Sequence, residues 1–182
     1  GQVRFGNDLE QFSRLLEEAR SALALLLRDS VLGVAPHSLR AVAREDLMRM
    51  AEMAPGGPVH MHLAEQIAEV EEVSVAWGTR PVEWALEHLD LGPAWTLIHC
   101  TQMLPHETVG LAGTGAVAGL CPLTEASLGD GIFDGVRWFD AGGWISIGSD
   151  SNIRISLAEE LRQLDTSQRL RDHSRAALAT SE

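Results

Sequence analysis

One stretch decides the fold class: Pro58-Val59-His60-Met61-His62-Leu63-Ala64-Glu65-Gln66. It reads as a short buried strand that ends on an imidazole and, three residues later, a carboxylate. Two later apolar runs also end on a side chain that can bind a metal, Trp95 to His99 and Trp144 to Asp150. Because helical patterns separate the three runs, we predict parallel strands whose carboxyl ends share one rim, as in an α/β barrel.

Helical and strand-like patterns alternate along the chain. Apolar spacing predicts helices at 8–27, 40–53, 66–77 and 79–89, another that begins near Pro105, a short one at 136–141, and one from Leu157 to the end. Strands are predicted at 31–37, 59–63, 95–100, 116–122 and 144–148, and 123–135 reads as a loop. This order, with short connections, predicts parallel strands joined by right-handed crossovers.

The number of strands limits the architecture. Five predicted strands are too few for a complete (β/α)8 barrel, and 182 residues fall short of the about 250 that such a barrel takes. An open doubly wound sheet would cluster its ligand groups at one switch point. Here almost every predicted strand ends in a polar residue that could bind a metal or take part in catalysis. This favours an α/β fold that is a partial (β/α)8 TIM-type barrel, with about strands 4–8 present, as a single domain over residues 1–182.

Composition narrows the partners and the compartment. A net charge of −12 argues against nucleic acid and against an anionic membrane surface, which both need Lys and Arg. Cys100 and Cys121 lack CxxC spacing and lie in or beside strand patterns, which favours reduced core thiols over a disulfide or a ligand pair. The sequence has no apolar run of membrane-spanning length and no signal-peptide pattern, so we expect a soluble cytoplasmic protein.

The side chains at the strand ends suit a zinc site. Catalytic Zn²⁺ takes imidazole and carboxylate ligands and lowers the pKa of a bound water toward neutrality. His62 and Asp150 are the best ligand candidates, and Asp150 could also steer or accept the water proton. Glu65 lies close enough to His62 to carry a proton to a leaving nitrogen. His99 could hydrogen-bond the hydroxide or the tetrahedral intermediate, or serve as a further ligand.

The other histidines have simpler interpretations. His60 shares a face with His62 by the two-residue period of a strand but would lie one layer deeper, so a core or supporting role is favoured. His88, His106 and His173 fall in helical patterns, and we expect them to be solvated. A lone strand histidine is more often a core residue, but its charged neighbours make His62 a stronger candidate.

Further candidates flank the predicted strands. His37 and Arg40 end the first one, and the planar fork of Arg40 would match a substrate carboxylate. An ordinary arginine at a helix start explains Arg40 equally well. Glu125 and Asp130 follow the strand 116–122 and could line the pocket or cap the next helix; a role in ordering the loop is favoured.

Four motifs together resemble the amidohydrolase superfamily. They are His-Met-His-Leu-Ala-Glu-Gln at 60–66, Ile-His-Cys-Thr at 98–101, Gly-Leu-Cys-Pro-Leu-Thr-Glu-Ala-Ser-Leu-Gly-Asp-Gly-Ile-Phe at 119–133, and Gly-Ser-Asp-Ser at 148–151. The resemblance extends over nearly the whole chain. The Ala-Glu-Gln at 64–66 and the Thr-Glu-Ala-x-Leu-Gly-Asp-Gly loop are its most specific parts. Within the superfamily, the motifs are most similar to the branch that hydrolyses a formimidoyl group.

This resemblance implies a metal-dependent hydrolase that acts on a non-peptide C–N bond of a linear amidine. The implied reaction converts N-formimidoyl-L-glutamate, a small anionic substrate, to N-formyl-L-glutamate and ammonia in histidine degradation. The implied cofactor is one Zn²⁺. The resemblance further implies zinc ligation by His62 and Asp150, catalysis by Glu65, His99 and Asp150, and substrate contact by His37 and Arg40.

The chain departs from the family pattern at its start. The family's first strand carries a His-x-His pair, and no histidine precedes His37. His60 and His62 have that spacing, but their Ala-Glu-Gln continuation matches a later strand. We therefore expect a fragment without the first strands and the small β-domain, with two zinc ligands missing, weak zinc binding and little or no turnover. The full-length parent would be the active form, and a homodimer of it is compatible with the family pattern.

Two alternatives stay open from the sequence alone. The first is a relative that deaminates a purine or triazine-like heterocycle, which would not need Arg40. The second is a non-catalytic, truncated chain that acts only as a structural partner.

Overall fold

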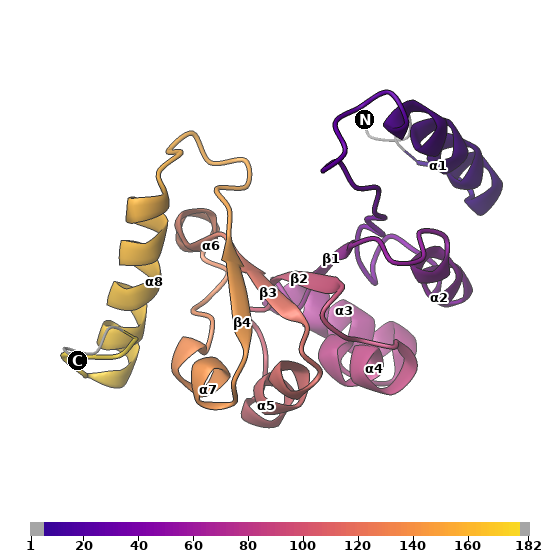
Figure 1. The fold of residues 1–182 in the computed structure, drawn as a ribbon. Helices are drawn as coiled ribbons and strands as arrows, with labels where there is room; N and C mark the ends of the chain where they lie inside the picture. The colour runs from indigo at the N-terminus through magenta and orange to yellow at the C-terminus, as the bar shows by residue number, and fades with distance from the viewer. Residues whose placement is uncertain (1–5, 179–182) are drawn as a thin grey trace.

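A parallel four-stranded sheet lies at the centre of the molecule (Figure 1). The computed structural model describes residues 6–178. The strands are hydrogen-bonded in the order β1 (Val59–Leu63), β2 (Trp95–His99), β3 (Val117–Leu120) and β4 (Trp144–Ile147). Every neighbouring pair is parallel, so all four carboxyl ends lie at the same edge of the sheet.

Helices connect and flank the strands. They are α1 (Leu9–Leu23), α2 (Arg44–Glu52), α3 (Ile67–Trp77), α4 (Pro81–His88), α5 (Pro105–Gly113), α6 (Pro122–Leu128), α7 (Gly135–Asp140) and α8 (Leu157–Asp172). In Figure 1, α8 (yellow) lies at one end of the molecule and α1 and α2 (indigo and purple) lie at the other, with the sheet between them. The predicted alternation of strands and helices is confirmed.

The two faces of the sheet differ in burial. Alternate residues such as Met61, Leu63 and Leu97 are at most 1% exposed and form the core with the helices. The intervening residues form what we call the open face, which includes His60, His62, Thr96 and Ile98. His60 is exposed, so its predicted place in a deeper core layer is wrong. Its face has no second layer among residues 6–178.

Three other predictions differ from the structure. Residues 31–37 form no regular strand; Val34 and Ser38 make isolated parallel bridges to β1, and Pro36 between them has no N–H for a ladder. The predicted loop 123–135 contains α6, with a proline at the helix start and Gly129 in the left-handed conformation at its end. The last helix ends at Asp172 instead of continuing to the end of the described chain.

Both cysteines are free and buried, as predicted. Burial raises the pKa of Cys121 to about 12, and it raises the pKa of Cys100 as well. Neither thiol is therefore a ready nucleophile or metal ligand. Within the described part of the chain, no helix has both the length and the apolar character needed to cross a membrane.

Candidate active site

Backbone strain collects at the carboxyl ends of the strands. Ala64, His99, Cys100 and Asp150 have φ values of 50°, 73°, 53° and 51°, in the left-handed region. Among residues 6–178, the only other non-glycine with positive φ is His173, at the end of α8. Side chains other than glycine rarely adopt this conformation, and strain of this kind is concentrated at functional sites. It marks the edge of the sheet where the sequence predicts chemistry.

Three imidazoles lie in a row along this edge. The ring centroids of His37 and His62 are 4.8 Å apart, and those of His62 and His99 are 5.7 Å apart. The Nδ1 of His62 donates to the carbonyl oxygen of His37 at 2.8 Å. The ring is thereby fixed with Nε2 left for another partner, which is the usual arrangement of a metal-binding histidine.

His99 lies between two carboxylates. Its ring is buried, with Nδ1 3.2 Å from Oε1 of Glu125 and Nε2 3.9 Å from Oε1 of Glu65. Burial alone lowers the pKa of His99, but the hydrogen bond to Glu125 and the charge of Glu65 outweigh it and leave the pKa raised. The surroundings therefore favour the charged ring.

The loop after β1 holds Glu65 in place. The backbone N–H groups of Ala64 and Glu65 donate to the carboxylate of Glu69 at 3.0 and 2.8 Å, and Glu69 is fully buried. The hydroxyl of Thr101 donates to the carbonyl of Glu65, and the N–H of Gln102 donates to the carbonyl of Ala64 at 2.8 Å. Glu65 is thus fixed by α3 and by the loop after β2.

The carboxylate of Glu65 connects the imidazoles to a cation. Its Oε2 lies 3.8 Å from Nη2 of Arg40, and its other oxygen, Oε1, makes the contact with His99. Burial raises the pKa of Glu65, and the charge of Asp130 adds to this effect, while the charge of His99 opposes it. A carboxyl with a raised pKa can hold and release a proton closer to neutrality.

Asp150 lies just after β4 and is exposed. The hydroxyl of Thr124 in α6 donates to the carbonyl of Ser149 at 3.0 Å, which ties this strand end to α6. The charge of Asp150 contributes to the raised pKa of His99. Asp150 therefore acts electrostatically on the other strand ends, while the direct contacts link the five residues we call the strand-end cluster: His37, Arg40, His62, Glu65 and His99.

The sequence did not identify two residues that support this cluster. The sequence assigns no role to Glu69, and for Glu125 it favours a role in ordering the loop, with pocket lining or capping of the next helix as alternatives. Both are buried carboxylates in the first turn of a helix that follows a strand. A glutamate at that position is the only sequence signal that indicates them, since each receives N–H groups from the preceding strand end.

The donor chemistry at the strand ends fits zinc. His62 offers Nε2 and Asp150 offers a carboxylate, and both are ordinary zinc ligands. One group of three or more potential ligands in residues 6–178 has all its ligand atoms within 4.8 Å of one another: Glu83, His106 and Glu107. Its carboxylates already have partners outside the group, because Glu107 pairs with the side chain of Arg80 at 2.8 Å and Glu83 accepts the backbone N–H of Arg80 at 3.4 Å.

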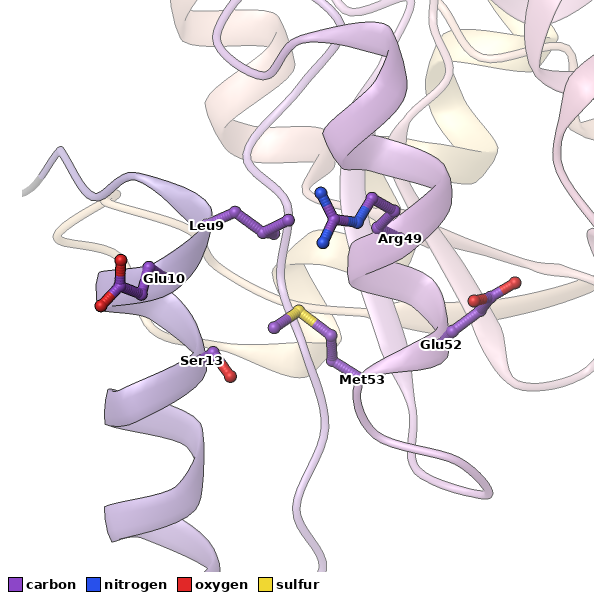
Figure 2. A pocket seen from close by; sticks show the side chains of 6 residues that line it. All are labelled: Leu9, Glu10, Ser13, Arg49, Glu52 and Met53. Atoms are coloured by element: carbon purple, nitrogen blue, oxygen red, sulfur yellow. The ribbon is translucent and has the colours of Figure 1, made fainter.

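A separate hollow of about 640 Å³ lies between α1 and α2 (Figure 2). The residues that line it are Leu9, Glu10, Ser13, Arg49, Glu52 and Met53. None of them belongs to the strand-end cluster, so this hollow has no part in the chemistry considered below.

Comparisons with known proteins agree with this geometry. A model of the Amidohydrolase family matches residues 7–182. The chain is similar to the formimidoylglutamate deiminase of Pseudomonas aeruginosa, at 42% identity over 98% of this chain and 39% of that protein. It is also similar to the crystal structure of an amidohydrolase from Brucella melitensis, with a TM-score of 0.95 and 51% identity over 100% of this chain and 40% of that one.

A more distant neighbour is an adenosine deaminase from Xanthomonas campestris, whose structure contains bound zinc. Its TM-score is 0.84 at 24% identity, over 96% of this chain and 40% of that one, so the likeness is one of fold. The chain thus spans about two fifths of the length of the relatives it matches. The parallel sheet and its helices are part of an amidohydrolase barrel, which confirms the predicted fold class. The chain belongs to the amidohydrolase family.

Proposed function

We propose that a barrel containing this chain hydrolyses N-formimidoyl-L-glutamate to N-formyl-L-glutamate and ammonia, a step in histidine degradation. The similarity to the Pseudomonas aeruginosa deiminase supports the choice of substrate. The observation that carries the chemistry is His99, held between Glu65 and Glu125 and stacked beside His62. Because the chain spans about two fifths of its relatives, the proposal assigns turnover to the longer protein, and we expect weak zinc binding and little turnover from the chain alone.

His62 and Asp150 are the residues that would hold the zinc. The hydrogen bond from Nδ1 of His62 to the carbonyl of His37 leaves Nε2 as the ligand atom. Bound zinc supplies a water of lowered pKa and a Lewis acid for the formimidoyl group. Asp150, with its exposed carboxylate beside the cluster, would accept a proton from that water.

The proton chemistry follows from Glu65 and His99. Water adds to the formimidoyl carbon, the C=N bond becomes a single bond, and the bond to the terminal nitrogen then breaks as ammonia leaves. The departing nitrogen needs a proton, and the raised pKa of Glu65 suits its carboxyl to deliver one. His99, with Nε2 on the side of Glu65, would hydrogen-bond the tetrahedral intermediate.

Substrate recognition would fall to Arg40 and His37. The substrate carries two carboxylates, and the guanidinium of Arg40 lies beside Glu65 with about a third of its side chain exposed. Arginine binds a carboxylate through two parallel hydrogen bonds. Burial lowers the pKa of His37, and the charges of His62 and Arg40 add to this effect, so a neutral ring would contact the substrate.

A chimaera tests the proposal: residues 1–182 replace the matching segment of the Pseudomonas aeruginosa enzyme. We expect ammonia release from N-formimidoyl-L-glutamate and little from adenosine. The unaltered enzyme is the control for assay and metal loading. A folded, zinc-loaded chimaera that prefers adenosine would reject the proposal in favour of a heterocycle deaminase, and one that releases ammonia from neither substrate would favour a non-catalytic chain.

A further inference from the structure

Glu125 makes one contact that no capping role requires. Its Oε1 accepts the backbone N–H of Cys121 at 2.8 Å, which is an ordinary contact at a helix start. The same oxygen lies 3.2 Å from Nδ1 of His99, which belongs to a different strand. An ionised carboxylate can only accept hydrogen bonds, so the proton of this contact must be on the imidazole.

We propose that Glu125 is a positioning residue that fixes the ring orientation of His99 and the tautomer of its neutral form, with the proton on Nδ1 and the lone pair of Nε2 directed toward the side of Glu65. The catalytic meaning of this arrangement rests on the proposed function. The arrangement itself can be measured without any turnover.

Burial makes the contact hard to replace. Glu125 is 4% exposed and His99 is 1% exposed, so neither side chain can exchange its partner for bulk water. The backbone of Glu125 is held as well, because its N–H donates to the carbonyl of Cys121 at 2.9 Å. Rotation of the ring away from Glu125 would leave a buried acceptor without one of its donors, which is unfavourable.

The consequence concerns which nitrogen exchanges protons. With Nδ1 committed to Glu125, only Nε2 of a neutral ring can accept a proton, and Nε2 lies 3.9 Å from Oε1 of Glu65. The free nitrogen of His99 therefore faces the carboxyl that would serve the departing nitrogen. Glu125 itself is too deeply buried to reach a substrate.

The test is the ¹⁵N NMR spectrum of the histidine side chains in the full 182-residue chain without metal, at a pH high enough for neutral rings. We expect the His99 proton on Nδ1 and an acceptor-type shift for Nε2. Glu125→Leu removes the acceptor and should move the proton to Nε2, whereas Glu125→Gln keeps an acceptor oxygen and should leave it on Nδ1. The control is Glu160→Gln, a matched change at a buried glutamate that contacts the N–H of Leu123.

Two results would overturn the inference. The first is a wild-type chain whose His99 carries its proton on Nε2. This measurement needs no variant, so it tests the inference even if Glu125→Leu fails to fold. The second is a folded Glu125→Leu chain with the wild-type tautomer. Both readouts use metal-free protein, so they are independent of the proposed function. The tautomer can be as inferred while the chimaera fails to release ammonia, and the chimaera can release ammonia while the tautomer differs from the inferred one.

Discussion

The ring of His62 donates its Nδ1 hydrogen to the carbonyl oxygen of His37, at 2.8 Å. The backbone N–H of His62 donates to the same oxygen at 3.0 Å, so the strand end and the ring are fixed by one acceptor. Backbone carbonyls commonly orient metal-binding histidines in this way. Because the acceptor belongs to the main chain, the orientation of His62 does not depend on the side chain at position 37.

Substitutions of His62 and His37 should therefore differ in their effect on zinc binding. In the chimaera, His62→Ala removes a ligand and should weaken zinc binding by more than the roughly 10–100-fold that loss of an outer partner costs. His37→Ala keeps the carbonyl and should retain zinc. The measurement is zinc content after dialysis against a graded chelator, with His60→Ala on the open face as the control. Equal zinc loss in His37→Ala and His62→Ala would argue against this arrangement.

Arg40 should determine substrate affinity. Arg40→Ala in the chimaera removes a charged hydrogen-bond donor worth about 1.5–3 kcal/mol, which corresponds to a KM for N-formimidoyl-L-glutamate raised roughly 10- to 150-fold. Steady-state kinetics of the Arg40→Ala chimaera would measure this rise in KM. The control is Arg44→Ala, because Arg44 stacks over Trp77 instead of facing Glu65. An unchanged KM would remove Arg40 from substrate recognition.

Glu65 should make the chain less stable as the pH rises. Its pKa is raised in the folded state, so its stabilising contribution is complete below its ordinary value of 4.5 and is lost as the pH rises through the folded pKa. Glu65→Gln has no proton to lose and should gain stability relative to wild type between about pH 4.5 and about pH 7.5. The gain in the free energy of unfolding is roughly 1.4 kcal/mol for each unit by which folding raises the pKa of Glu65.

Urea unfolding of the 182-residue chain and of its Glu65→Gln variant at both pH values measures this difference. Glu71→Gln, at an exposed position on α3, is the control. A stability difference between Glu65→Gln and wild type that stays constant with pH would show that the carboxyl of Glu65 titrates normally.

Glu69 should stabilise the loop after β1. It is fully buried and accepts the N–H groups of Ala64 and Glu65. Glu69→Leu leaves these donors without an acceptor, so we expect a loss of about 1–3 kcal/mol in the free energy of unfolding for each donor that stays buried. Glu72→Leu, on an exposed position of the same helix, should change it by less than about 0.5 kcal/mol. Equal effects in urea unfolding would contradict the role of Glu69.

The strand ends were predictable because their information is local. A short apolar run locates each strand, so His62 falls one residue before the end of β1 and His99 ends β2, and parallel order brings such ends together. Residues 31–37 carried a similar apolar run, but Pro36 limits their pairing to isolated bridges. The sequence analysis interprets α6 as a loop because of the Gly and Asp residues around Gly129. The two helix signals are Pro122, at the start of α6, and Gly129, at its end.

The supporting contacts were not predictable from spacing. His99 and Glu125 are 26 residues apart, and their hydrogen bond depends on how α6 lies against the end of β2. The burial of His60 was predicted wrongly for a related reason, since burial of the open face depends on what covers it rather than on the alternation along β1.

The most direct test of the central claim is an anomalous-difference map at the zinc edge from crystals of the chimaera grown with zinc. We predict a peak at the strand ends, about 2.0–2.2 Å from Nε2 of His62 and from a carboxylate oxygen of Asp150. A peak at Glu83, His106 and Glu107 with none beside His62 would contradict the account.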